Sequence, residues 1–235
     1  RTLYSTIYGP LVAMPQVGLA WTDTMAFSMR DANSANQRAL GTWVRIARAT
    51  NVDDVRKAVT ETLGIPWVNT IVADRYGNAL HADVTSVPNV SAEKVAECAT
   101  PFSGLVASRL TLLDGARSEC NWTVTKGTPV PGLLPASEQA IQQRRDSVAN
   151  SNDSYWLSNA SAPNKQLSPI LGAWGESVTL RTRANFQETD AVLAIGPLTH
   201  ERAQALAFSN RSLAAEMVVD PLLSICESEP AAKAA

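Results

Sequence analysis

The polar, turn-rich segment VANSNDSYWLSN contains, in its NSN motif, two asparagines whose side-chain amides can donate and accept hydrogen bonds. Its two asparagines, Asn150 and Asn152, lie two residues apart, so both side chains fall on one side if the segment is extended. An amide NH2 on a rigid loop can donate a hydrogen bond to the oxyanion that forms when a carbonyl is attacked. Composition alone favours a different role, in which both amides bond neighbouring backbone in Asx turns.

The three cysteines and two histidines of the chain give poor support to a metal site, because the cysteines lack CxxC spacing. Cys98 and Cys120 bracket a stretch rich in turn-forming residues, which favours a disulfide in an oxidising compartment. Cys226 is then left unpaired. The alternative is three buried free thiols in a cytosolic protein, since spacing cannot fix the connectivity.

The composition describes an ordinary globular surface, with 45% apolar residues, 18% charged residues and a formal net charge of -2. It provides no basic field that would attract phosphate backbones, so nucleic acid is not an expected partner. No apolar run approaches the roughly 20 residues that a membrane-spanning helix requires, and no signal-peptide pattern opens the chain. Because Arg1 is neither an initiator Met nor part of a flexible leader, we expect the polypeptide to have been cut from a longer one.

Apolar periodicity predicts a strand over residues 3–12, broken at Gly9-Pro10, and then two helices. The first helix, residues 32–49, is expected to begin after Asp31 as N-cap and to bury an apolar stripe. That stripe is Leu40, Trp43, Val44 and Ala47. The second helix is expected to begin at Thr50 or Asn51 and to end at Gly64, which would supply a left-handed exit. Its expected buried residues are Val52, Val55, Val59 and Leu63.

Farther along the chain, the pattern predicts one hairpin and three helices. The hairpin spans residues 67–87, with its turn at Arg75-Tyr76-Gly77-Asn78. Residues 88–135 have the composition of an irregular surface excursion with short helices. The helices are expected at 137–148, at 179–195, and from Thr199 onward, the last halted or kinked at Pro221.

Five segments, taken together and in order, resemble the penicillin-amidase family. They are RTLYSTIYGPLV, FSMRDANSANQRALGTWVRIARATNVDDVRKAV, GIPWVNTIVADRYGNAL, VANSNDSYWLSN, and SPILG with LRTR. The resemblance runs from residue 1 to about residue 226 and is greatest to the branch that contains acyl-homoserine-lactone acylases and aculeacin-type acylases. It implies an α+β fold that is part of an αββα four-layer sandwich of the N-terminal-nucleophile hydrolase type.

In the family that the chain resembles, a precursor cuts itself so that the nucleophilic Ser becomes the first residue of a β-subunit. No residue of this chain matches that Ser. The resemblance therefore implies that residues 1–226 are an internal segment of the β-subunit, and that 227–235 are a frayed tail or the start of a truncated remainder. The implied partners are the α-subunit and the Ser-headed part of the β-subunit.

The resemblance also implies roles for individual polar side chains. Asn152 corresponds to the oxyanion-hole donor, with Asn150 as the nearest competitor for the role. Arg181 corresponds to the arginine that orients the site, and Arg183 could exchange roles with it. Without the resemblance, two arginines at the start of a helix are usually solvated surface charges.

Three aromatic residues correspond to the lining of an acyl pocket: Trp43, Trp67 and, more weakly, Phe27. Ordinary core packing would account for the two tryptophans equally well. A disulfide between Cys98 and Cys120 suits this branch, and Cys226 would bond to a cysteine outside this chain.

The activity implied by the resemblance is hydrolysis of the amide that joins a fatty acyl chain to an N-acyl-homoserine lactone, a quorum-quenching reaction. Penicillin-type amides are expected as further substrates. The free α-amine of the Ser serves as general base, so neither a triad nor a cofactor is required. The alternatives are a lipopeptide or β-lactam acylase, or a non-catalytic secreted domain that binds an apolar ligand. We expect a periplasmic or secreted protein without a membrane span.

Overall fold

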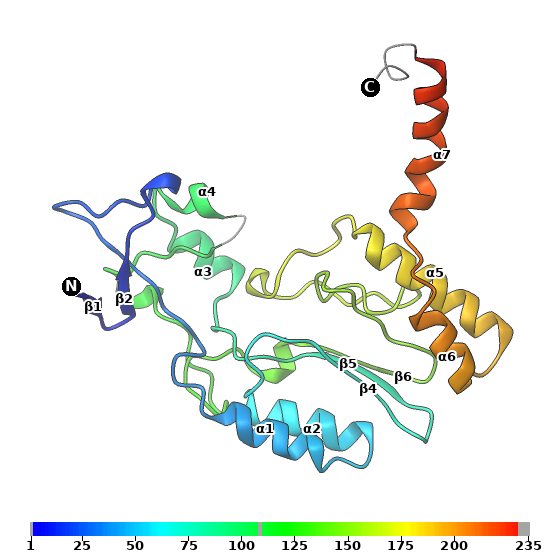
Figure 1. Cartoon of the computed structure of the whole chain (residues 1–235). Coiled ribbons are helices and arrows are strands. Elements are labelled where there is room, and N and C mark those ends of the chain that lie inside the picture. Colours follow the sequence, from blue (N-terminus) through cyan, green and yellow to red (C-terminus); the bar gives the residue numbers. More distant parts are fainter. Residues whose placement is uncertain (1, 108–109, 230–235) are drawn as a thin grey trace.

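The computed structural model describes residues 2–107 and 110–229 of the chain. At its centre is a three-stranded antiparallel sheet with the strand order β4-β5-β6. The strands are β4 (Thr70–Ala73), β5 (Ala79–Asp83) and β6 (Ala140–Arg144). Helices α1 (Arg38–Ala47) and α2 (Val52–Thr62) lie on one face of this sheet, and the long segment after β6 crosses the other face (Figure 1).

Helix α2 forms where it is predicted, because its N-terminal end carries an expected capping group and its inner face is apolar. The Asn51 side chain accepts a hydrogen bond from the main-chain N–H of Asp54 at 2.9 Å. The apolar face packs against β5 in the main core. That core consists of Val52, Val55, Val59, Leu63, Ile65, Leu80, Ala82, Val84 and Leu133.

The left-handed residue at the end of α2 is Leu63, at φ 44°, and not Gly64 as predicted. Gly64 is needed for a different reason, the close approach of α1. A Cβ on Gly64 would lie 2.2 Å from Thr42 Oγ1 and 2.9 Å from the main-chain carbonyl of Arg38. The Arg38 guanidinium also donates to the carbonyls of Thr62 and Leu63, so the two helices are fixed at this point.

Helix α1 begins six residues later than predicted, at Arg38. Asp31 is not its N-cap, because the Asp31 carboxylate accepts from the N–H of Asn33 at 2.8 Å in an Asx turn. The predicted buried stripe is also wrong for this chain. Leu40 is 75% exposed and Trp43 is 46% exposed, while Thr42 faces the interior.

The predicted helix at 137–148 is wrong, because this stretch contains the 3-10 turn Ala136–Glu138 and the strand β6. Pairing with β5 overrides the helical propensity of its glutamines. Ile141 lies opposite Ala82 in the ladder and packs against the main core. The Gln139 amide bonds both the N–H and the carbonyl of Thr85, which extends the pairing beyond the strand end.

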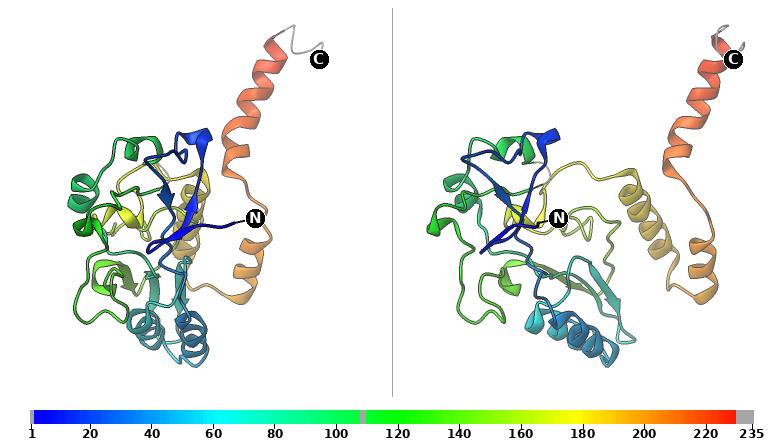
Figure 2. Two further views of the ribbon diagram at one scale, coloured as in Figure 1. Left: turned by 90° about the vertical axis from the view of Figure 1, so that its left-hand side faces the viewer. Right: turned by 60° about the vertical axis from the view of Figure 1, so that its left-hand side comes forward.

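The predicted helix over 179–195 is confirmed as α5 (Leu180–Ile195), capped by Thr179. The helix predicted from Thr199 is instead two helices, α6 (His200–Ala207) and α7 (Leu213–Ser228). The break lies at Asn210, which adopts a φ of 52°. Pro221 neither halts nor ends α7, which continues to Ser228 and extends away from the rest of the chain (Figure 2).

The N-terminal part forms a second three-stranded sheet, from β1 (Ser5–Thr6), β2 (Gly9–Val12) and β3 (Phe27–Ser28). Its small core is Leu19, Phe27 and Val106. The irregular stretch beside it includes the short helices α3 (Ala92–Glu97) and α4 (Ser103–Val106), as predicted.

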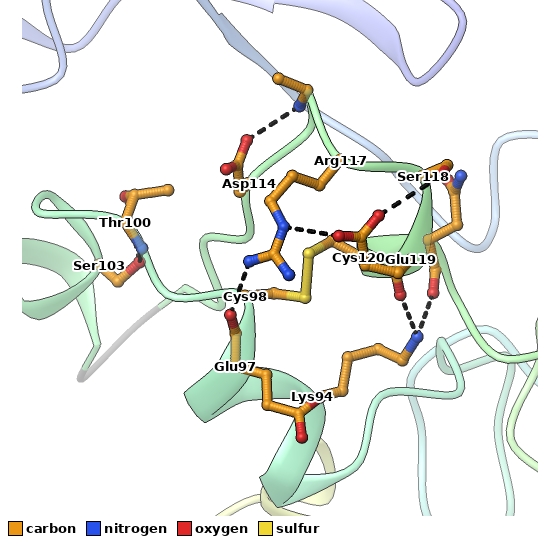
Figure 3. The surroundings of a disulfide bond; sticks show 12 residues. Lys94, Glu97, Cys98, Thr100, Ser103, Asp114, Arg117, Ser118, Glu119 and Cys120 are labelled. Carbon is orange, nitrogen blue, oxygen red and sulfur yellow. Dashed lines mark hydrogen bonds and ion pairs between the residues drawn. A yellow bond between two sulfur atoms is a disulfide. The ribbon is translucent and has the colours of Figure 1, made fainter.

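The Cys98–Cys120 disulfide is confirmed, with the two Cα atoms 5.6 Å apart (Figure 3). Cations hold the chain on either side of it. Lys94 Nζ donates to the carbonyls of Glu119 and Asn121, each at 2.7 Å, and Arg117 donates to the carbonyl of Glu97 at 2.9 Å. Cys226 is not disulfide-bonded within this chain.

The described residues form a mixed α+β structure, as expected. The αββα layering of a complete sandwich stays a prediction, because the described residues form two separate three-stranded sheets and not two stacked layers of one sandwich. Within residues 2–107 and 110–229, no helix is both long enough and apolar enough to cross a membrane.

His81 lies on the face of β5 opposite the main core, because side chains alternate along a strand and its neighbours Leu80 and Ala82 face α2. Its side chain is completely buried. Burial lowers the pKa of His81 from 6.5 to about 4, since the charged imidazolium would lose its hydration. The ring is therefore neutral at physiological pH.

We predict that Gly64→Ala destabilises the full-length protein, because the added methyl group must displace the main chain of α1. The expected loss in the free energy of unfolding is about 1–3 kcal/mol. Gly41→Ala is the matched control, since Gly41 is an exposed position of α1 where an added Cβ would meet no other atom within 4 Å. That change should be neutral or stabilise by up to about 1 kcal/mol. Equal unfolding midpoints for the two variants would contradict the close packing at Gly64.

We also predict that His81 makes stability depend on pH. Its folded-state pKa lies below its unfolded value, so the unfolded state binds more protons between pH 6.5 and about 4. The free energy of unfolding therefore decreases as the pH is lowered through this window. Between pH 7 and pH 4.5 the loss attributable to His81 is about 2 to 3 kcal/mol. Denaturant unfolding should show this loss reduced in His81→Gln and retained in His200→Gln, a change at an exposed residue of α6. An unchanged loss in His81→Gln would refute the assignment.

Candidate functional site

The segment between β6 and α5 forms a tight turn at residues 150–153, and Asn150 closes this turn. Asn150 Oδ1 accepts from the main-chain N–H of Asn152 at 2.7 Å, and its Nδ2 donates to the main-chain carbonyl of Asp153 at 3.0 Å. Both ends of the Asn150 amide are thus used within the turn. The Asx turn expected from composition therefore forms at Asn150.

Asn152 has a different environment from its neighbour. Its backbone adopts the left-handed conformation, with φ at 64°, and its side chain is exposed. Its Oδ1 accepts from the guanidinium of Arg181 at 3.1 Å. Within the described residues its Nδ2 has no hydrogen-bond partner. The hydrogen bond from Arg181 to Oδ1 therefore fixes the orientation of the amide and leaves its NH2 group available to an external acceptor. An amide in this position can donate a hydrogen bond to an external acceptor, and its role as oxyanion donor stays a prediction.

Arg181 reaches the turn from the first turn of α5. Its Nη2 donates to Asn152 Oδ1 and to the main-chain carbonyl of Ser151. Arg183 has no side-chain hydrogen bond within the described residues and lies on the exposed surface of the same helix. Of the two arginines that the sequence left open, Arg181 is therefore the one that contacts the Asn152 turn.

Asp153 anchors the turn to α5, a role that the sequence analysis missed. Its Oδ2 accepts from the main-chain N–H of Thr179 at 3.0 Å, from the Thr179 hydroxyl at 2.9 Å, and from the Thr182 hydroxyl. Desolvation opposes ionisation of Asp153, but these hydrogen bonds outweigh it and lower its pKa. The carboxylate also lies at the N-terminal end of α5, where the helix dipole favours a negative charge.

A further contact between the turn and α5 comes from Asn185, whose Nδ2 donates to the Ser151 hydroxyl at 2.9 Å.

The Asp153 anchor has one signal in the sequence, the Thr-x-x-Thr spacing at Thr179 and Thr182 that follows an Asp in a polar turn. Thr179 is an ordinary N-cap in that pattern, because it also bonds the N–H of Thr182. Asp153 could not be identified as the residue that binds Thr179 before the tertiary structure was known.

The three aromatic residues expected in an acyl pocket are not brought together by this chain. Trp43 lies half-exposed on α1, and Trp67, in the turn before β4, is 77% exposed. Phe27 is buried in the N-terminal core, where its ring packs edge-on against the ring of Phe102 with the two ring centroids 5.8 Å apart. The pocket role of the two tryptophans stays a prediction, and Phe27 is placed as a core residue of the N-terminal part.

Surface hollows lie between α5 and α6 and between α1 and α2, and neither is lined by these aromatic residues. Within residues 2–107 and 110–229, no three His, Cys, Asp or Glu side chains converge closely enough to hold a metal ion. The candidate site is therefore an amide NH2 group on a turn that is held by hydrogen bonds to α5 and its N-cap.

Comparison with known proteins gives a family for this chain. The family model described as penicillin amidase matches residues 1–235. An acyl-homoserine lactone acylase PvdQ from Pseudomonas syringae pv. syringae is 38% identical over 229 residues, which cover 97% of this chain and 29% of that protein. An aculeacin-A acylase from Actinoplanes utahensis is 35% identical over 243 residues, which cover 100% of this chain and 31% of that protein.

A further acyl-homoserine lactone acylase PvdQ, from Pseudomonas fluorescens, is 36% identical over 234 residues, which cover 100% of this chain and 29% of that protein. The chain thus spans about three tenths of the length of the curated relatives it matches. The resemblance found in the sequence is confirmed, because the family model matches residues 1–235. This chain belongs to the penicillin amidase family.

Proposed function

We propose that this chain is part of an acylase that cleaves the amide bond between a fatty acyl chain and the amine of an N-acyl-homoserine lactone. The observation that carries the proposal is the side-chain amide of Asn152. Arg181 donates to its oxygen, and its NH2 group has no acceptor among the described residues. The relatives described as acyl-homoserine lactone acylases support the substrate class.

In the proposed mechanism, the nucleophile is the N-terminal Ser of another chain of the same precursor. Its hydroxyl oxygen attacks the amide carbonyl while its own α-amine takes the proton, and the carbonyl oxygen becomes negatively charged. Asn152 donates a hydrogen bond to that oxygen, a contribution of about 3 kcal/mol to lowering the barrier. The leaving amine receives the proton, and water then hydrolyses the acyl ester to free the Ser.

Arg181 has a supporting role in this mechanism. Its positive charge next to Asn152 Oδ1 polarises the amide and makes its NH2 a better donor. The Ser151 carbonyl holds the guanidinium in place, so the Asn152 amide cannot rotate without breaking its hydrogen bond to Arg181. The donor is therefore oriented before the substrate binds, as electrostatic stabilisation of a transition state requires.

The aculeacin-A acylase among the relatives favours a lipopeptide as the second candidate substrate. Penicillin-type amides are a third. All three share an acyl amide, and they differ in the amine that leaves and in the length of the acyl chain. We further propose a periplasmic or secreted location, supported by the Cys98–Cys120 disulfide, since such bonds persist in oxidising compartments.

We predict that Asn152→Ala in the complete acylase lowers kcat by about 100- to 1,000-fold with little change in KM, because the lost donor acts mainly in the transition state. The matched control is Asn210→Ala. Asn210 is likewise exposed and left-handed, with φ at 52°, so it reproduces the backbone strain of alanine at such a position. Steady-state kinetics with wild-type kcat in Asn152→Ala would assign the oxyanion to another group.

We also predict that kcat/KM rises with acyl length. Each methylene that enters an apolar slot contributes about 0.8 kcal/mol, or roughly fourfold, until the slot is full. Trp67→Ala should flatten this dependence if Trp67 lines the slot. Trp21→Ala is the control, since Trp21 is also an exposed tryptophan but contacts Tyr4 in the N-terminal sheet. A preference for aromatic or very short acyl groups would point to a different substrate class.

A further inference from the structure

A chain of three polar side chains runs from the buried face of the central sheet to the Asn152 turn. His81 Nε2 lies 3.2 Å from Asn69 Oδ1, and Asn69 Nδ2 donates to Asn150 Oδ1 at 3.2 Å. Asn150 then holds the main chain of the turn. Asn69 precedes β4 and lies 81 residues from Asn150 in the sequence, so this is a tertiary connection.

The donor and acceptor of each hydrogen bond between these three side chains are fixed by the two main-chain groups that Asn150 binds at the turn. The N–H of Asn152 can only donate and the carbonyl of Asp153 can only accept, so Asn150 must present Oδ1 to the first and Nδ2 to the second. Asn69 must then present its NH2 to Asn150 Oδ1 and its own Oδ1 to the imidazole. It follows that His81 donates from Nε2, and that its Nδ1, which is buried without a partner among the described residues, carries no proton in the neutral ring.

The turn needs such support because its conformation is costly. The left-handed region costs about 1–2 kcal/mol for most residues other than glycine and less for Asn, and such a residue stays there when its surroundings hold it. At Asn152 the main-chain N–H is held by Asn150 Oδ1, and that same oxygen is held by Asn69. Arg181 holds the side chain of Asn152, whereas Asn69, acting through Asn150, holds the backbone of Asn152.

We propose that Asn69 is a positioning residue, which acts through Asn150 to keep the backbone of Asn152 left-handed and so aims its NH2 group at the oxyanion. His81 fixes the orientation of the Asn69 amide. This inference rests on the proposed function, because it takes Asn152 as the donor. Neither Asn69 nor His81 touches the substrate in this account.

The test is a double-mutant cycle in the complete acylase, with kcat and KM measured on an N-acyl-homoserine lactone. Asn69→Leu removes both hydrogen bonds at nearly constant volume. It should lower kcat about 10- to 100-fold, because a small misplacement of a catalytic group has effects of this size, and it should leave KM within about twofold. In the Asn152→Ala background the same change should cost less than about twofold, since its effect passes through Asn152.

Asn78→Leu is the matched control. It removes two amide hydrogen bonds to Asp74, at the opposite end of the same β-hairpin, and the one that Arg145 donates to Asn78 Oδ1. Asn78 has no link to Asn150 among the described residues. It should lower the unfolding midpoint without the fall in kcat. If Asn69→Leu does not fold, Asn69→Ala is the second variant and carries the same expectation.

The possible results separate this inference from the proposed function. A loss of kcat in Asn152→Ala with wild-type kcat in Asn69→Leu overturns the positioning role alone. An equal loss from Asn69→Leu in both backgrounds also overturns it, because the residue would then act on the structure in general. Wild-type kcat in Asn152→Ala overturns both. A crystal structure of the Asn69→Leu enzyme should show residue 152 shifted from positive φ, and an unchanged turn would contradict the inference.

Discussion

The two hydrogen bonds that Asn150 makes to the main chain of its own turn are the interactions on which the candidate site depends. They curl four residues tightly enough to place Asn152 in the left-handed region, with its side chain directed outward. If the turn relaxed to an extended strand, both asparagines would lie on the same side and neither would be singled out. The turn thus gives two neighbouring asparagines different roles, one structural and one free to act on a ligand.

The turn is stable because it is joined to two separate elements. On one side, the Asp153 carboxylate and the Arg181 guanidinium connect it to the first turn of α5. On the other side, Asn69 connects it to the hairpin of β4 and β5. Opposite charges at the start of α5 have different roles here, since the carboxylate holds the N-cap residue Thr179 and the guanidinium orients an amide. A site supported by a helix and a sheet is held more precisely than one on a free loop.

Local signals in the sequence predicted the elements that depend on local interactions. The capping of α2 by Asn51, the helix over 179–195, the hairpin turn at Gly77, and the Cys98–Cys120 pair are all present. The helix predicted at 137–148 failed because the partner of β6 is β5, which lies far earlier in the chain, and pairing with it outweighs helix propensity.

Within the candidate site, the sequence could indicate Asn152 and Arg181 only through the family resemblance. The choice between Arg181 and Arg183 needed the helix start and its orientation. Asn69 gave no signal, because a single polar residue before a strand is common and its partner lies in another part of the chain. Exposure could not be predicted either. Trp43 has helical spacing that suggests burial, yet α1 presents it to the surface of this chain.

The most direct test of the central claim is a crystal structure of the complete acylase with an alkylboronic acid bound to its N-terminal Ser. The tetrahedral boronate places an oxygen where the oxyanion forms. We expect that oxygen to lie about 2.7–3.1 Å from Asn152 Nδ2, with residue 152 still left-handed and Arg181 still bound to Oδ1. A boronate oxygen held by other groups, with Asn152 Nδ2 facing solvent, would contradict the account.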